Sequence, residues 1–200
     1  MSRIEVRTFA GAGIAPYLDA IAALRIVVFR EWPYLYAGDC AHEKDYLAAY
    51  AQSAQSLFAL AFDGERVVGA SMGLPLADET ALVQQPFLDR EIALDDVFHF
   101  GESVLLADYR GMGLGHRFFD ERERHARQLG RFAMTSFCAV ERAPDDPRRP
   151  GNSPSNDMFW SKRGYRRQDD MLCQVEWPEV GVAGKVCHRM RFWLRPLERA

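Results

Sequence analysis

Three glycines occupy every second position from 111 to 115 of this chain, between a strand-like and a helix-like segment. The apolar run 97–106 predicts a strand, and the amphipathic stretch 114–129 predicts a helix that ends at Gly130. Glycine within an element lowers stability. A cluster of glycines at this junction therefore indicates either a backbone path that other residues cannot follow or a ligand that approaches the main chain.

The segment 131–140, after the predicted helix, reads as a further strand, which completes a strand–helix–strand crossover of the kind that joins parallel strands. The glycine turn would then lie at the C-terminal end of a strand and at the N-terminus of a helix. Backbone N–H groups there have no helical partner, and the helix dipole is positive. Closely spaced glycines let a phosphate group reach those N–H groups, so we predict an anion site, most consistent with a pyrophosphate.

The remaining sequence predicts a single mixed α and β domain over residues 1–200, without internal repeats. A long loop rich in proline and polar residues, 143–155, indicates function or disorder. Alternating or apolar runs predict further strands near 4–9, 56–63, 66–76, 171–177 and 185–194, and helical patterns cover 14–30, 42–54 and a short stretch from Ser153 to Arg163.

Charge and residue spacing narrow the classes of function. The net charge of −3 argues against nucleic acid as the main partner. The four cysteines form no CxxC pair and no metal-ligand spacing occurs, so we expect small buried thiols and no metal. No signal peptide is recognisable, and Asp19 and Arg25 interrupt the most apolar segment, so we expect a cytoplasmic protein that does not span a membrane.

Two familiar phosphate-binding loops match the glycine turn poorly. A P-loop requires a Lys-Ser/Thr pair after the glycines, and this chain has none. The dinucleotide fingerprint G-x-G-x-x-G is closer, because the chain has G-x-G-x-G followed by His116, and Glu141 ends the next strand where a ribose-binding acid would lie. However, the rest of the chain offers no second series of parallel strand–helix–strand units.

The segment Arg110-Gly111-Met112-Gly113-Leu114-Gly115 matches R/Q-x-x-G-x-G, the pyrophosphate loop of the GNAT superfamily of N-acetyltransferases. The chain resembles that family further in LLADYRG, which leads into the loop, in MFWSKRGYRR, which resembles the family's second helix, and in the order of elements along most of its length.

This resemblance implies one GNAT-type domain with a mixed, mostly antiparallel sheet, helices on both faces, and the fourth and fifth strands splayed apart. It implies acetyl-CoA as co-substrate, with the pyrophosphate on residues Arg110 to Gly115 and the pantetheine arm on the backbone of Leu105 and Leu106. It further implies direct transfer of an acetyl group, in a ternary complex, to an amine of a small molecule or peptide. We expect a monomer or homodimer.

Glu102 is the candidate general base. Strict alternation along FHFGESVLL would place its carboxylate on one apolar face with the residues Phe98, Phe100, Val104 and Leu106, where burial makes a carboxylate a better base near pH 7. Many glutamate bases of the resembled family lie at this place. Two other interpretations remain: Glu102 is paired with an arginine, or Gly101 forms a bulge that turns it to the other side.

Trp160 stands where many relatives have the tyrosine that protonates the leaving thiolate. Because an indole N–H is no practical acid, Trp160 is expected to pack, and the protonating group must lie elsewhere or be absent. Tyr34, Tyr36 and Trp160, with the loop 143–154, are candidates for lining the acceptor pocket, and the two tyrosines could equally cover the core. Arg122 and His125 fall inside the apolar arc of the helix 114–129, where we expect a satisfied, partly buried pair.

The sequence thus predicts an N-acetyltransferase for an unidentified amine. A catalytically silent acyl-CoA-binding or sensing module is the alternative, favoured by Trp160. A nucleotide-binding oxidoreductase is a third interpretation, disfavoured by the predicted topology.

Overall fold

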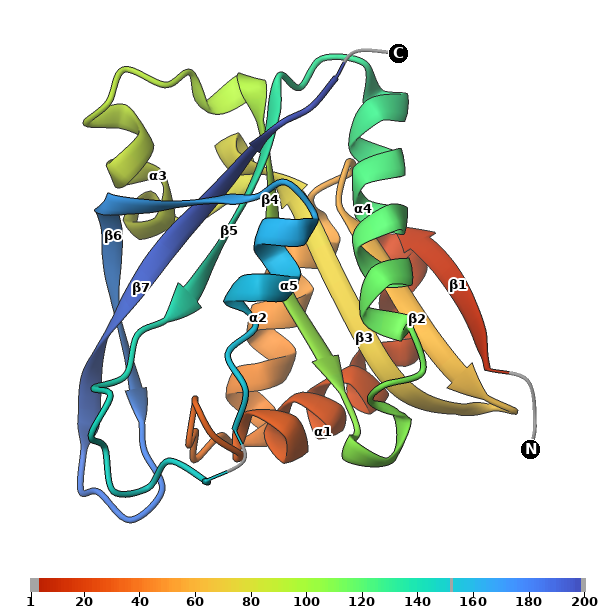
Figure 1. Cartoon of the computed structure of the whole chain (residues 1–200). Helices are drawn as coiled ribbons and strands as arrows, with labels where there is room; N and C mark the ends of the chain where they lie inside the picture. The colour runs from red at the N-terminus through yellow and green to blue at the C-terminus, as the bar shows by residue number, and fades with distance from the viewer. Residues whose placement is uncertain (1–3, 152, 199–200) are drawn as a thin grey trace.

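The structure, a computed structural model, describes residues 4–151 and 153–198. Seven strands form one sheet in the order β1-β2-β3-β4-β5-β7-β6 (Figure 1). The prediction of one mixed sheet with helices around it is confirmed. The strands are β1 (Glu5–Ala10), β2 (Leu57–Asp63), β3 (Arg66–Pro75), β4 (Val97–Leu105), β5 (Met134–Val140), β6 (Arg166–Pro178) and β7 (Lys185–Pro196).

Only β4 and β5 pair in parallel, and the other neighbouring strands are antiparallel. The crossover between β4 and β5 is α4 (Leu114–Leu129), whose bounds are those that the sequence predicts and which ends at Gly130 with a φ of 72°. A dinucleotide-binding domain needs a series of parallel strands, so this topology does not fit the oxidoreductase alternative.

The helices cover the two faces of the sheet with different apolar clusters. On one face, α1 (Leu18–Phe29) and α2 (Cys40–Gln52) bury the largest cluster together with α3 (Ala81–Leu88). On the other face, α4 packs over β2, β3 and β4, and α5 (Asp157–Lys162) packs beside it against β5 and β7 (Figure 1). The side chains on β4 and β5 therefore point either toward α1 and α2 or toward α4 and α5.

Two helices begin at residues other than those that the sequence predicts, and local hydrogen bonds explain where they start. Asp39 caps α2 by accepting hydrogen bonds from the N–H groups of Ala41 and His42, at 3.0 and 3.1 Å, so the helix begins at Cys40. The short helix α5 begins at Asp157 rather than directly after Ser153, and the Ser155 hydroxyl accepts a hydrogen bond from the Asp157 N–H at 3.1 Å. The loop before α5 is correspondingly longer than predicted, and its residue Asn152 lies outside the described residues.

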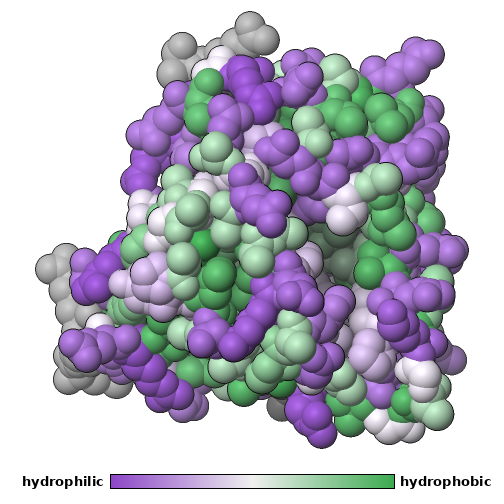
Figure 2. Space-filling model, turned by 180° about the vertical axis from the view of Figure 1, so that it is seen from behind, coloured by the Kyte–Doolittle hydropathy of each residue, from purple (hydrophilic) through white to green (hydrophobic). Residues whose placement is uncertain are grey.

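The N-terminal helical stretch Gly11–Phe29 is long and apolar enough to cross a membrane, by length and composition alone, with a mean hydropathy of 1.7. In the structure its side chains Ile14, Ile21 and Leu24 pack in the core against the sheet, as those of a core helix do. The side of the molecule opposite to the view of Figure 1 carries hydrophobic side chains interspersed among hydrophilic ones (Figure 2).

Candidate functional site

A cleft opens where β4 and β5 separate. The two strands pair only from Val97 opposite Met134 to His99 opposite Ser136, and beyond these residues they diverge (Figure 1). The space between them continues into a cleft of about 950 Å³, walled by β4, β5, β7, α4, α5 and the loop after α1. The predicted splaying of the fourth and fifth strands is confirmed, and the cleft has the volume of a pocket for a small organic ligand.

The glycine turn lies at one edge of this cleft. Gly111 and Gly113 both have a φ of +78°, a conformation that side chains other than glycine rarely adopt, and Gly113 caps α4. Gly115 has an ordinary φ, and a Cβ added to it would meet only the ring of Phe159, at 3.7 Å. Gly115 is also the residue of the turn that lines the cleft. The backbone path thus explains Gly111 and Gly113, whereas open approach to the first N–H groups of α4 explains Gly115.

The other predicted members of the loop have different surroundings. Met112 is exposed, and Leu114 is 3% exposed in an apolar cluster between α4 and the sheet. The guanidinium of Arg110 donates to the carboxylate of Glu31 at 2.7 Å and to the Leu105 carbonyl at 3.3 Å. Arg110 therefore ties the turn to β4 and to the segment after α1.

The backbone of β4 presents alternate residues to the cleft. The Leu106 N–H donates to Val68 on β3, and its carbonyl accepts from the Tyr109 N–H, both at 3.0 Å. Hydrogen-bonding residues alternate along an antiparallel pair, so Leu105 and Ser103 direct their backbone groups away from β3. Both line the cleft. The expectation for Leu105 fits this geometry for its N–H, while its carbonyl accepts from Arg110. Both backbone groups of Leu106 are engaged elsewhere. Ser103 takes a place that the sequence did not suggest.

Glu102 lies on the face opposite to that of Phe98 and Phe100. Met72 pairs with Glu102 but the next residue, Gly73, pairs with Phe100, so Gly101 is an unpaired bulge. Before the bulge the phenylalanines pack under α4, and after it Val104 packs with the cluster of α1 and α2. The expectation that these residues share one face is wrong, because the bulge reverses the alternation.

The carboxylate of Glu102 belongs to a buried charge triad with Arg25 and Glu43. Arg25 on α1 donates from Nε to Glu43 on α2 and contacts Glu102 through Nη1. The side chains are only 9%, 1% and 9% exposed for Arg25, Glu43 and Glu102. The interpretation of Glu102 as an arginine-paired carboxylate is confirmed. Its Oε1 atom is buried without a hydrogen-bond partner among the described residues, and Glu102 lines the cleft.

Trp160 packs in the cleft wall. Its ring lies 5.0 Å from that of Phe137 on β5 and 5.2 Å from that of Trp193 on β7, measured between centroids. These contacts agree with the expected packing role. On α4, His125 contacts the Gln55 carbonyl through Nε2 at 2.9 Å, as expected of a satisfied side chain. Arg122, by contrast, lines the cleft, which its position in an apolar arc did not reveal.

Of the two tyrosines proposed for the acceptor pocket, Tyr34 lines the cleft and Tyr36 does not. Tyr36 is 8% exposed in the core, where burial, followed by its hydrogen bond to Glu43, raises its pKa. Tyr34 packs against Phe29 and Trp177, at 4.6 and 5.9 Å between ring centroids. Tyr34 therefore has one side in the core and one side at the cleft.

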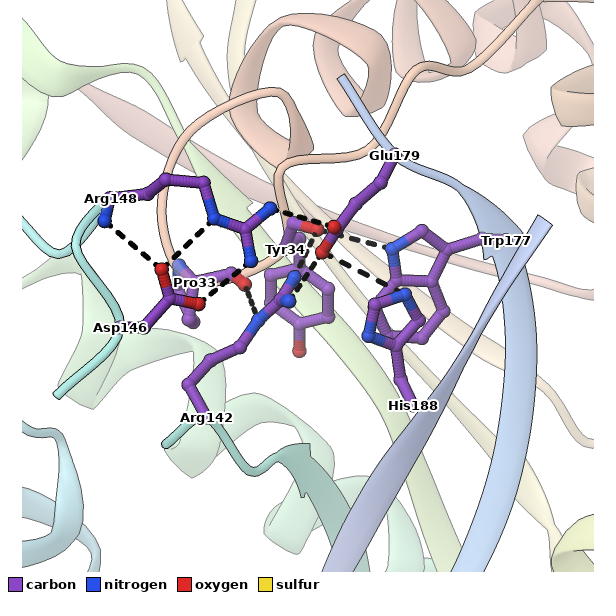
Figure 3. Close-up of polar contacts among 8 residues, drawn as sticks. All are labelled: Pro33, Tyr34, Arg142, Asp146, Arg148, Trp177, Glu179 and His188. Atoms are coloured by element: carbon purple, nitrogen blue, oxygen red, sulfur yellow. Dashed lines mark hydrogen bonds and ion pairs between the residues drawn. The ribbon is translucent and has the colours of Figure 1, made fainter. Parts of the chain in front are cut away.

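A buried carboxylate, Glu179, stabilises the part of the cleft wall that contains Tyr34. In Figure 3 the guanidinium groups of Arg142 and Arg148 both point toward it, and both form ion pairs with it. Arg142 also donates to the carbonyls of Pro33 and Tyr34, at 2.6 and 2.8 Å. Burial opposes ionisation of Glu179, but the hydrogen bonds from the two arginines outweigh it and hold its pKa below the ordinary value. This cluster joins the loop after β5 to the loop after α1.

The acidic residues next to the loop after α1 already have partners. Glu31 binds Arg110, Asp39 caps α2 and Glu43 binds Arg25, so none of the three carboxylates is left to face the cleft as a free charge. Arginines outnumber acids in the cleft lining, which contains Arg122, Arg142, Arg149, Arg167, Arg189 and Arg191 against Glu102, Glu141 and Asp157.

No protein-family model matches the chain, and no curated protein matches it in sequence. Solved structures do match. An acetyltransferase of the GNAT family from Staphylococcus aureus Mu50 is 13% identical, with a TM-score of 0.61 over 98% of this chain and 100% of that chain. The ribosomal-protein-S18-alanine N-acetyltransferase from Escherichia coli is 12% identical, with a TM-score of 0.57 over 99% of this chain and 96% of that chain.

A third similar structure, yncA from Salmonella typhimurium, holds acetyl-CoA as its cofactor. It is 12% identical, with a TM-score of 0.59 over 98% of this chain and 95% of that chain. Likeness at such low identity is a likeness of fold. The strand order, the single parallel pair and these matches over nearly the full length show that this chain has the fold of the GNAT acetyltransferases.

Proposed function

We propose that this protein transfers an acetyl group from acetyl-CoA directly to an amine of a small molecule or peptide. The observation that carries the proposal is the glycine turn at the N-terminus of α4, which opens onto the cleft between the splayed strands β4 and β5.

The residues present fit coenzyme A. The N-terminal N–H groups of α4 and the open space above Gly115 suit a pyrophosphate. The backbone groups of Ser103 and the N–H of Leu105 face the cleft and suit the amides of a pantetheine arm, whereas the Leu105 carbonyl accepts from Arg110. When bound, the coenzyme supplies an acetyl group activated as a thioester.

Glu102 is the proposed base, acting directly or through a water. Its carboxylate lies on the side of α1 and α2, and Glu102 lines the same cleft as Trp32 and Tyr34. Arg25 holds one carboxylate oxygen, and the other has no hydrogen-bond partner among residues 4–151 and 153–198. The unpartnered oxygen is therefore the one that would accept the amine proton.

The alternative is an acyl-CoA-binding module without turnover. The packing of Trp160 against Phe137 and Trp193 favours it, because this position offers no phenol to protonate a leaving thiolate. Release of free thiol from acetyl-CoA, measured across a panel of amines, separates the two functions. Turnover with any amine supports the enzyme, whereas binding without turnover supports the module.

Binding of acetyl-CoA to a Gly115→Val variant tests the site. The new side chain has room in the folded protein, because only the Phe159 ring lies within 4 Å of the added Cβ. It would, however, occupy the space above the first N–H groups of α4. We expect calorimetry to show acetyl-CoA binding to the parent but no NAD binding, and at least a tenfold loss of acetyl-CoA affinity in the variant, about 1.4 kcal/mol.

Gly13→Val is the matched control, since Gly13 also has an ordinary φ and nothing within 4 Å of an added Cβ, and it does not line the cleft. Gly113→Val should also weaken binding, but the positive φ of Gly113 adds backbone strain, so its effect is less specific. If folded Gly115→Val binds acetyl-CoA as tightly as the parent, the turn is not the phosphate site.

A further inference from the structure

One charged side chain in the cleft wall is buried without a counter-ion. Arg122 on α4 is 2% exposed and takes part in none of the ion pairs of the described residues. Its Nε donates to the Phe118 carbonyl and its Nη1 to the Glu102 carbonyl, each at 3.3 Å. Its Nη2 is buried with no hydrogen-bond partner there.

The surroundings of Arg122 hold the cation in place without neutralising it. The guanidinium carbon lies 4.2 Å from the ring centroid of Phe100 and 4.6 Å from that of Phe119. Such contacts stabilise a cation, but an unpaired buried charge remains costly. Burial lowers the pKa of Arg122 to about 9, so the side chain is still protonated at pH 7. A cleft with an unpaired guanidinium in its wall is suited to a ligand that carries a negative charge or develops one during the reaction.

The position of Arg122 along α4 indicates which part of a ligand it meets. It lies eight residues after Leu114, which corresponds to ~12 Å along a helix. The pantetheine arm of coenzyme A has twelve bonds from its phosphate-ester oxygen to its sulfur, as many as four residues of backbone, or ~14 Å when extended. A coenzyme whose phosphates bind at the glycine turn therefore brings its sulfur to the level of Arg122. This step rests on the proposed function.

We propose that Arg122 stabilises the thiolate that leaves coenzyme A during acyl transfer. The amine nitrogen attacks the thioester carbonyl carbon, and a C–N bond forms. As the C–S bond breaks, its electron pair stays on sulfur, beside the guanidinium, while the amine proton goes to the base. The thiolate takes up a proton from water after transfer. Charge stabilisation by Arg122 thus replaces the protonation that Trp160 cannot perform.

Other ionisable groups around Arg122 are occupied or neutral. Glu123, on the same helix, binds Arg163 at 3.2 Å and also binds Arg195. Tyr165, before β6, and Tyr50, on α2, interact electrostatically with Arg122, and burial raises the pKa of both phenols, which keeps them neutral at pH 7. The carboxylate of Glu102 points to the other face, toward Arg25.

The thiol pKa of bound coenzyme A tests the proposal without any acceptor. Free coenzyme A and coenzyme A saturated with protein are each titrated with pH, and the thiolate is followed by its ultraviolet absorbance. A cation beside the sulfur lowers the thiol pKa, so the wild-type value should lie at least about one unit below that in Arg122→Met. Arg124→Met is the matched control, since Arg124 lies on the same helix, is exposed and does not line the cleft. It should leave the thiol pKa unchanged.

Arg122→Lys keeps a positive charge and should keep most of the lowering. Equal thiol pKa values in wild type and Arg122→Met, with coenzyme A bound to both, would overturn the proposal and leave the proposed function intact. If Arg122→Met does not fold, a thiol pKa of coenzyme A bound to wild type that lies above the thiol pKa of free coenzyme A overturns the proposal. Failure of wild type to bind coenzyme A would refute both. Tighter binding of succinyl-CoA than of acetyl-CoA, lost in Arg122→Met, would assign the guanidinium to a carboxylate of the acyl group instead.

Discussion

Removing the cation of the buried triad should destabilise the protein strongly. Arg25 is the shared partner of Glu43 and Glu102, and its guanidinium carbon lies 4.4 Å from the Tyr46 ring centroid. Arg25→Met keeps the apolar stem that packs there and removes only the charge and its hydrogen bonds. Two carboxylates, 1% and 9% exposed, would then remain buried with no cation between them.

The magnitude follows from the burial of the triad. At an effective dielectric constant of about 20, one contact between opposite charges is worth roughly 4 kcal/mol before the cost of desolvation. Breaking a buried pair by removing one partner typically costs about 3–5 kcal/mol, because the remaining charge is left uncompensated. We expect Arg25→Met to lose this amount of unfolding free energy, a large share of the roughly 5–15 kcal/mol that a folded protein has.

Urea unfolding at pH 7, followed by tryptophan fluorescence and circular dichroism, measures the loss, with equal m-values required for the comparison. The double variant Arg25→Met/Glu43→Gln removes one of the stranded charges and should recover about 1–3 kcal/mol. The exposed control Arg124→Met should change stability by less than about 0.5 kcal/mol. A loss below about 1 kcal/mol, or no recovery in the double variant, would show that water reaches these carboxylates and that the triad is not a buried charge cluster.

Three further predictions concern single side chains. Glu102→Gln should lower turnover by roughly 10²–10⁴-fold while acetyl-CoA affinity is retained; unchanged turnover where chemistry limits the rate would place the base elsewhere. Trp160→Tyr supplies a phenol in the cleft and should gain no rate in the chemical step if Arg122 already stabilises the thiolate, as proposed; a higher rate would show that the thiolate leaves unassisted. Trp160→Phe should stay within about tenfold of the parent, since one neutral hydrogen bond is worth about 1 kcal/mol. A thousandfold loss in Trp160→Phe would mean that the indole acts on the transition state. Burial lowers the pKa of His99, whose Nδ1 lies 2.9 Å from the Ser136 hydroxyl. The unfolded chain therefore binds more protons than the folded one, so this contribution to stability is complete above the unfolded histidine pKa of about 6.5 and is lost as the pH falls below it. Urea unfolding at several pH values should show a weaker loss toward acid in His99→Gln than in wild type, and identical slopes would contradict the assignment.

Local patterns predicted the elements that depend on neighbouring residues only. The bounds of α4, the C-cap at Gly130 and the positive φ values in the glycine turn follow from periodicity and from the conformational freedom of glycine. The cleft follows from the crossover, because a strand that leaves its partner after three paired residues opens the sheet.

The surroundings of Glu102 depend on residues distant in the sequence, which local patterns do not contain. The bulge at Gly101 arises from its pairing with β3, and a Cβ there would lie 2.3 Å from the Tyr50 hydroxyl on α2. Alternation alone therefore placed the Glu102 side chain on the wrong face of β4. Arg25 is 77 positions before Glu102, so only the folded structure reveals their ion pair. The pattern FHFGESVLL could signal the bulge only through its glycine.

Because the bulge turns the Glu102 side chain toward α1, two charges lie on opposite sides of β4. The Glu102 carboxylate points toward α1, whereas Arg122 on α4 donates to the carbonyl of the same residue from the other face. In the proposed reaction the amine loses its proton on the side of Glu102, and the thiolate departs on the side of Arg122. A tetrahedral intermediate in the cleft would then have its base and its leaving-group cation on different faces of the sheet. Neither charge neutralises the other, because Arg25 already binds the carboxylate. This separation leaves the positive charge of Arg122 available to the departing thiolate, because the guanidinium is not paired with the carboxylate of Glu102.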